Sequence, residues 1–163
     1  MVYTILLLLG DVMHDLDFAI LKTIIYADIF SFPMTPEEIH HFLIYDEPVS
    51  FNVIQDKLQS SALLNDQLCT NNVYYALEHR EELLSLRTQR EVMMLSLSPR
   101  MIFFGRVLSY FPFVEMVGIT GALAMRNPSS DNDDLDYLIV TRPGRVWLAR
   151  ASIIFLVRLM RLR

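Results

Sequence analysis

The stretch "GITGALAMRNPSSDNDDLDYLIVT", residues 118–141, places four aspartates between a glycine-containing turn and an apolar run. β-Branched and apolar residues predict a strand over 114–120 and a second strand over 135–141. Between them, residues 121–125 are expected to form a short helical turn and 127–130 a loop. A helix over 146–162 follows Pro143-Gly144. This succession predicts the beginning of a mixed α/β domain.

Two of the aspartates, Asp134 and Asp136, stand two residues apart at the start of the second strand. Alternation along a strand directs both side chains to the same face. Two carboxylates so close repel each other unless a cation lies between them. Mg²⁺ takes a few carboxylates together with phosphate oxygens and water. We therefore predict that Asp134 and Asp136 bind a divalent cation that carries a nucleoside triphosphate.

The glycine at the end of the first strand is the candidate phosphate site. Gly121 and Ala122 would let backbone N–H groups approach a phosphate closely, at the start of a helical turn. Arg126 could reach the triphosphate or could be a solvated arginine at the helix end. Asp131 and Asp133 belong either to the metal-binding cluster or to a solvated turn, because aspartate-rich loops are commonly solvated turns.

The front half of the chain reads as helices followed by a hairpin. Residues 16–30 are apolar nearly all round, which predicts a buried helix. Thr35, Pro36 and Glu38 have the spacing of a capped helix start. Ser50 is expected to cap a third helix over 51–64. The later elements are a hairpin that turns at residues 70–72, a connecting helix over 78–95, and another helix after Pro99.

Three helices and a hairpin follow the order of a winged helix-turn-helix. The fold class expected for the chain is therefore α+β, with a winged-helix domain over residues 1–95 and a mixed α/β domain over 96–163. The two halves differ in charge: residues 1–100 carry a net charge of −8 and residues 101–163 a net charge of +3. This asymmetry suggests two different tasks.

The segments "TGALAMRN" and "DDLDYLIVT" resemble the motifs of the polymerase-β-like nucleotidyltransferase superfamily, in particular bacterial members with an N-terminal winged helix. The resemblance covers most of the chain. It implies Mg²⁺-dependent transfer of a nucleotidyl group from a nucleoside triphosphate to an acceptor hydroxyl. It places Gly121 and Ala122 at the nucleotide phosphates, and Asp134 and Asp136 at the catalytic metal.

The chain departs from the family pattern in two places. The family usually has serine where Ala122 stands, and the lost hydroxyl removes a hydrogen bond worth ~1–2 kcal/mol. The family's third carboxylate lies on a later strand, and no Asp or Glu follows Asp136 here. The sequence is thus expected to be a fragment or a truncated form that binds nucleotide and scarcely transfers it. The exposed sheet edge would favour self-association.

Composition bears on the cellular compartment and on membrane association. The single cysteine, Cys69, excludes an internal disulfide and favours a reducing cytoplasm. The apolar start "MVYTILLLLGD" falls short of the ~20 residues of a membrane span and is expected to pack in a core. The last helix carries Arg150, Arg158 and Arg161 on one face, so it would either pack on a sheet or lie on a membrane surface.

Two other functions compete with nucleotidyl transfer. The first is a catalytically degenerate module that binds nucleotide or another protein. The second is a DNA-binding regulator, which requires basic side chains on the recognition helix. Residues 51–60 contain one lysine, Lys57, and one aspartate, in a half of the chain that is strongly acidic. Duplex DNA binding is therefore not expected.

Overall fold

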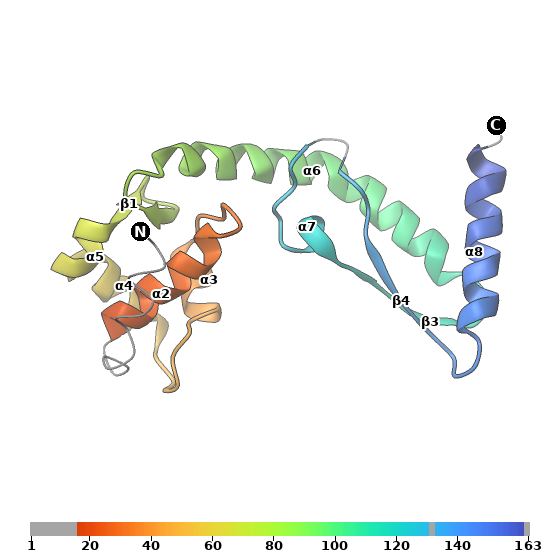
Figure 1. Cartoon of the computed structure of the whole chain (residues 1–163), viewed down its shortest axis with the longest axis horizontal. Coiled ribbons are helices and arrows are strands. Elements are labelled where there is room, and N and C mark those ends of the chain that lie inside the picture. Colours follow the sequence, from red (N-terminus) through yellow and green to blue (C-terminus); the bar gives the residue numbers. More distant parts are fainter. Residues whose placement is uncertain (1–15, 131–132, 162–163) are drawn as a thin grey trace. The chain divides into compact units, whose positions relative to one another are not determined.

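The computed structural model describes residues 16–130 and 133–161 (Figure 1). The expected core segment at the N-terminus and Asp131 lie outside these residues. The described chain mixes helices with two short sheets, so the α+β class is confirmed. Its contacts form two compact units, residues 1–88 (unit 1) and residues 89–163 (unit 2). The expected boundary at residues 95–96 and the division after residue 88 both fall within one helix, Glu81–Ser109.

The described part of unit 1 contains four helices and a hairpin, followed by the first residues of a longer helix. Their bounds are α2 Leu16–Asp28, α3 Pro36–His41, α4 Phe51–Ser60, α5 Ala62–Gln67, β1 Leu68–Thr70 and β2 Tyr75–Leu77. The hairpin pairs Leu68 with Leu77 and Thr70 with Tyr75. Asn72 in its turn has φ 70°, so the expected positive φ at asparagine is confirmed.

The start of α3 agrees with the sequence. The Thr35 side chain accepts a hydrogen bond from the backbone N–H of Glu38, and the Glu38 side chain accepts one from the backbone N–H of Thr35. The second carboxylate oxygen of Glu38 lies 2.9 Å from the guanidinium of Arg87, which is 1% exposed. That guanidinium also stacks 4.0 Å from the Phe32 ring. Glu38 therefore both caps a helix and neutralises a buried arginine.

The prediction of one helix over 51–64 is wrong, because the segment forms two helices, α4 and α5. Ser61 has an extended backbone (φ −72°, ψ 120°) and separates α4 from α5. Its hydroxyl accepts a hydrogen bond from the N–H of Leu64 and donates one to Asp17. Ser61 is thus a second N-cap, and capping serines compete with helix continuation. Ser50 begins α4 as predicted, but its side chain makes no capping hydrogen bond.

The apolar faces of these elements close around one core. Ile20, Ile39 and Ile54 are fully buried, and Leu64 is 1% exposed. They come from four different helices, α2, α3, α4 and α5. Burial of an aliphatic side chain of this size stabilises the fold by about 1.5–3 kcal/mol. Unit 1 therefore has the mutual packing that a small domain requires.

The long helix α6, Glu81–Ser109, corrects a second expectation. Pro99 was expected to end one helix and begin another, but it lies inside α6. Proline removes the hydrogen bond to the carbonyl four residues earlier. That carbonyl belongs to Leu95, which is 76% exposed, so water can replace the bond. Met94, Leu97 and Met101 are buried on the opposite side and hold the helix across the break.

Among the described residues, α6 is the helix whose length and composition would allow a membrane span. Its most apolar window has a mean hydropathy of 1.2, and 17% of that window is buried. Helices that pack inside soluble proteins satisfy the same criteria, so these values do not assign a membrane span.

Unit 2 continues with β3 Val114–Ile119, α7 Gly121–Ala124, β4 Tyr137–Thr141 and α8 Val146–Arg161. All four lie close to their predicted positions. β3 and β4 pair antiparallel, with Ile119 opposite Tyr137, and a bulge shifts the register between Val114 and Met116. Tyr137 packs toward α6, where its hydroxyl donates a hydrogen bond to the carbonyl of Met101 at 2.6 Å. The hairpin is thereby fixed to α6 by one of its faces.

Candidate functional site

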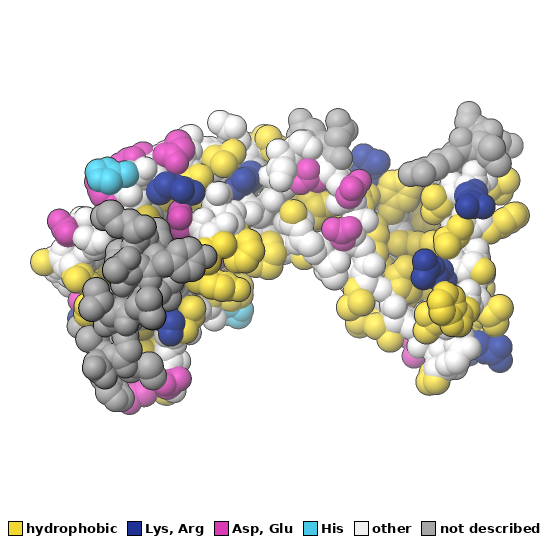
Figure 2. Space-filling model, viewed as in Figure 1, with side chains coloured by type: hydrophobic (Ala, Val, Ile, Leu, Met, Phe, Trp, Pro, Cys, Tyr) yellow, Lys and Arg dark blue, Asp and Glu magenta, His cyan; other side chains and the backbone are white. Residues whose placement is uncertain are grey.

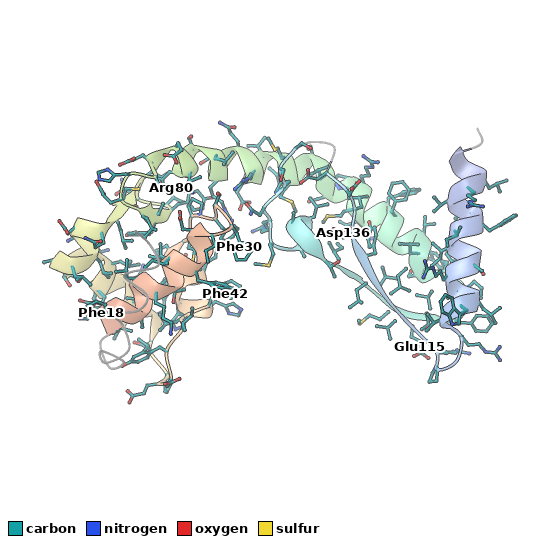
Figure 3. The ribbon with its side chains drawn as sticks, in the orientation of Figure 1. Phe18, Phe30, Phe42, Arg80, Glu115 and Asp136 are labelled. Carbon is teal, nitrogen blue, oxygen red and sulfur yellow. The ribbon has the colours of Figure 1, made fainter. Side chains whose placement is uncertain are left out.

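The antiparallel pairing of β3 with β4 brings together two segments that were singled out separately. Beyond the last pair of the ladder, the backbone N–H of Thr120 donates to the carbonyl of Asp136 at 2.9 Å. Gly121 is the next residue on one strand, and Asp136 directly precedes the other. Figure 3 shows Asp136 beside α7, whereas Glu115 lies at the far end of the hairpin. The glycine turn and the aspartate are therefore neighbours in space.

The contact between these two residues is close. Gly121 has φ +68°, a left-handed conformation that side chains disfavour. A Cβ at Gly121 would collide with the Oδ2 atom of Asp136. The backbone angle thus favours glycine, and a Cβ here would push the exposed Asp136 carboxylate aside. The carboxylate lies where backbone and metal-bound phosphate would meet.

The remaining residues of the turn are positioned by α7. Leu123 is 2% exposed and anchors α7 to Met94, Leu97 and Met101. Ala122 points away from this core and is exposed. Arg126 follows the helix end in a left-handed conformation (φ 54°) with an exposed side chain. It therefore lies at the opposite end of α7 from Gly121.

α7 has only four residues, so its dipole contributes little to phosphate binding at Gly121. The favourable field at a helix N-terminus comes from several aligned peptide dipoles, and a single turn has few of them. The other contribution to phosphate binding does not depend on helix length: the first N–H groups of any helix have no acceptor within it. In this turn they belong to residues around Gly121 and Ala122.

Asp134 and Asp136 lie in the extended segment before β4, and both are exposed. Along residues 133–141 exposed and half-buried positions alternate, which is the pattern of side chains on two faces. Their exposure agrees with the expected common face, but Asp134 also lines a cavity together with Tyr137 and Ile139, whereas Asp136 does not. Two exposed carboxylates supply hard oxygen donors and leave room for water and phosphate, which suits Mg²⁺. The donor chemistry of the two carboxylates fits a divalent cation.

Asp133 has a different role. Its carboxylate accepts hydrogen bonds from the backbone N–H groups of Ser129 and Ser130, the first at 2.5 Å and the second at 3.1 Å. It also accepts the Ser130 hydroxyl at 3.0 Å. Asp133 therefore braces the loop, which is the structural interpretation left open for it. The metal-site interpretation remains for Asp134 and Asp136.

A cavity of about 670 Å³ opens beside this segment within unit 2. Asp133, Asp134 and Arg100 are its charged wall, and the rest is apolar or aromatic. The other lining residues are Phe104, Val107, Leu108, Phe111, Leu135, Tyr137, Ile139, Ile153, Leu156 and Val157. Burial raises the pKa of the Tyr137 hydroxyl. The sequence did not indicate this cavity, because its walls come from α6, β4 and α8.

A second group of possible metal ligands lies in unit 1. Ligand atoms of Glu78, His79 and Glu81 stand within 4.8 Å of one another, and all three side chains are exposed. Cys69 lies nearby: burial and then the negative charges of Glu81 and Glu78 raise the pKa of its thiol. The thiol therefore stays protonated at neutral pH, unlike a nucleophile. Exposed acidic groups gather in this way without a metal.

Comparison of the chain with family models, with curated proteins and with solved structures finds no match in any of the three.

Proposed function

We propose that the chain is a nucleotidyltransferase-type protein that binds a nucleoside triphosphate with Mg²⁺ at the turn between β3 and α7. One observation carries the proposal: the Asp136 carboxylate lies directly against Gly121, whose positive φ favours glycine. Two motifs separated by a long loop thus converge on one point. The resemblance in sequence supplies the chemical interpretation of that point.

Each part of the site has a task in this proposal. Backbone N–H groups at Gly121 and Ala122 bind phosphate oxygens, because a residue without a side chain allows close approach. Asp134 and Asp136 hold the cation that neutralises the phosphates. The cation would stabilise the charge that develops during in-line transfer. Arg126 requires a long reach from the far end of α7, so its contribution is the smallest.

Binding without efficient transfer is the second candidate. The described residues place two carboxylates at this point, and the only group of three possible ligands found among them is at Glu78, His79 and Glu81. Two-metal transfer uses ligands for both the attacking and the leaving oxygen. A site with two carboxylates is therefore better suited to holding the nucleotide than to activating an acceptor.

For unit 1 we propose a winged-helix module that serves protein contacts or packing rather than DNA binding. Lys57, the one cation of α4, lies 2.8 Å from the Asp17 carboxylate. The Asp17 carboxylate therefore competes with a DNA phosphate for the only positive charge of this helix. Titration of a labelled duplex with the full chain at low salt is expected to show no tight binding; nanomolar, salt-dependent binding would contradict this proposal.

The central test is calorimetric titration of the full chain with a nucleoside triphosphate, with and without Mg²⁺. Binding is expected only with Mg²⁺. Asp136→Asn is expected to reduce the affinity by at least about tenfold, because a charged ligand of the cation is lost. Asp133→Asn is the matched control, since it makes the same change three residues away in the loop. Equal affinity of all three proteins would refute the proposal.

A pair of glycine variants separates backbone strain from the contact with Asp136. Gly121 and Gly144 have nearly equal φ angles, +68° and +72°, but a Cβ at Gly144 meets nothing within 4 Å. Alanine at either position costs ~1–2 kcal/mol in backbone strain. Only Gly121→Ala should abolish nucleotide binding, because only it displaces the carboxylate. Loss of binding in both variants would show that strain alone is responsible.

A further inference from the structure

Helix α8 carries a large apolar surface on its exposed side. Trp147 is 75% exposed and Phe155 is 70% exposed. Leu148 and Leu159 are about half exposed, and their spacing of seven and four residues from Phe155 places all three on one face. Ala149, 1% exposed, lies on the side that packs within unit 2. The exposed stripe is therefore additional to the buried face that fixes the helix.

Positive charge flanks this stripe. At about 100° per residue, Arg158 lies about 60° from Phe155 around the helix. Arg150 lies about 60° beyond Trp147 on the far side from the stripe, and both arginines are exposed. The Arg150 guanidinium lies 5.7 Å from the Trp147 ring. Figure 2 shows arginine side chains among apolar ones over α8. Residues 137–163 contain six arginines and no Asp or Glu, so the charge of the segment is entirely positive.

We propose that α8 docks on the surface of an anionic lipid bilayer. A helix of this kind lies in the plane of the interface, with Trp, Phe and Leu among the acyl chains and arginines at the headgroup phosphates. The long arginine side chains can extend outward while their stems stay apolar. Charge complementarity selects an anionic surface, since nothing in the segment repels it.

The apolar stripe favours a bilayer over a nucleic acid. Both offer phosphates to Arg150 and Arg158. A nucleic acid backbone, however, leaves three exposed aliphatic and aromatic side chains without an apolar environment. A bilayer removes them from water, at a gain of about 25 cal/mol for each Å² of apolar surface. The proposal is independent of nucleotide binding, because it uses neither Gly121 nor Asp136.

The protein contains its own probe for this interaction. Trp147 is the only tryptophan in the sequence, and it lies on the proposed surface. Its fluorescence is measured on the full chain with vesicles of phosphatidylcholine and with vesicles that also contain phosphatidylglycerol. Transfer of the indole from water into the interface shifts its emission to shorter wavelengths. We expect the shift with the anionic vesicles and a much smaller one with the zwitterionic vesicles.

Two matched pairs of variants, measured by vesicle cosedimentation, locate the contact. Arg158→Gln is expected to lower the partition coefficient on anionic vesicles about fivefold, the contribution of one cation near the surface. The control is Arg106→Gln, the same change at an exposed arginine of α6. Phe155→Ser should lower it about tenfold or more. Its control is Phe103→Ser, because Phe103 in α6 is 58% exposed.

Four results would overturn the proposal. The first is an unchanged Trp147 emission with anionic vesicles. The second is an emission shift that depends on protein concentration and occurs without lipid, which would assign the surface to a second copy of the chain. The third is an equal loss in Phe155→Ser and Phe103→Ser, which would indicate general hydrophobic adsorption. A shift caused by RNA and not by vesicles would likewise assign the arginines to nucleic acid.

Discussion

The two units use similar amounts of apolar sequence in opposite ways. Unit 1 turns its apolar side chains inward, and isoleucines from three helices are fully buried in one core. Unit 2 has a buried cluster of four residues, Met94, Leu97, Met101 and Leu123. Its strands leave Met116, Leu138 and Val140 between 39% and 53% exposed. The apolar side chains of unit 1 thus form one closed core, whereas unit 2 leaves several of its described apolar side chains exposed.

The difference arises from how each sheet is covered. In unit 1 the β-bridge between Met34 and Tyr75 ties the hairpin to the chain before α3, and α2 packs against β2. In unit 2 the two-stranded sheet packs on α6 through the Tyr137 side of β4. The exposed side bears Leu138, Val140 and, beyond the strand, Asp136. Charged and apolar groups therefore share the face that no described helix of unit 2 covers.

The largest expected effect is on the free energy of unfolding of unit 1 and tests the buried Glu38–Arg87 ion pair. Glu38→Ala leaves the guanidinium of Arg87 buried without its carboxylate and also removes the capping box of α3. Breaking a buried ion pair from one side costs about 3–5 kcal/mol. We expect the free energy of unfolding of unit 1 to fall by that amount. Amide hydrogen exchange of α2, α3 and α4 measures it directly.

Glu37→Ala is the control for this variant, because Glu37 is exposed and occupies the neighbouring position in the first turn of α3. Its effect should stay within about 0.5 kcal/mol. If the two variants exchange amides at the same rates, the Glu38–Arg87 pair contributes no more than a surface pair. Unit 1 would then owe its stability to apolar packing alone.

The next effect concerns the small core of unit 2. Leu123→Ala opens a cavity in a cluster of four residues and is expected to cost about 2–4 kcal/mol. Because Leu123 anchors α7, exchange should increase at Gly121 and Ala122 more than at β4. Nucleotide affinity should fall with it. Ala124→Gly, at an exposed position of the same helix, is the control for helix propensity, with a cost of about 1 kcal/mol. Unchanged protection of α7 in Leu123→Ala would show that the turn is held by the strand pairing.

Local signals in the sequence predicted much of both units. The capping residues at Thr35 and Glu38, the asparagine at Asn72 and the β-branched run before Gly121 act over a few residues, and each lies as predicted. The errors at Ser61 and Pro99 share another cause. At Ser61 a hydrogen bond to distant Asp17 accompanies the break. At Pro99 the helix continues because buried residues both before it (Met94, Leu97) and after it (Met101) pack in the core of unit 2. Tertiary contacts outweighed the local preference in both places.

The candidate site shows the same division. Spacing predicted that Asp134 and Asp136 share a face, because alternation in an extended segment is a local property. The contact between Asp136 and Gly121 depends on the register of β3 against β4, which no local pattern specifies. The cavity beside Asp134 was not predicted at all. Its walls meet only in the folded unit, so residue types such as Phe104 and Ile153 indicate a core position equally well.

A smaller effect is the dependence of the stability of unit 2 on alkaline pH. Burial raises the pKa of Tyr137, whose hydroxyl donates to the Met101 carbonyl. The hydrogen bond contributes ~1 kcal/mol, and Tyr137→Phe should remove that amount. A raised pKa in the folded state means that this contribution is complete below pH ~10 and is lost as the pH rises through the folded pKa. The difference between wild type and variant in amide exchange of β4 should therefore shrink above that pH.

The smallest effect distinguishes unit 1 on the acid side. Burial acts to raise the pKa of Asp17, but hydrogen bonds from Lys57 and Ser61 and the charge of Lys57 outweigh it, so the pKa is lowered. A lowered pKa gives a contribution that is present above pH ~4 and is lost as the pH falls through the folded value. Because Lys57 is 39% exposed, the pair is worth about 0.5–1 kcal/mol. Asp17→Asn, Lys57→Met and the double variant form a cycle that isolates it. A coupling free energy that persists unchanged at pH ~2, well below the usual pKa of an aspartate, would contradict this assignment, since a protonated Asp17 cannot attract Lys57.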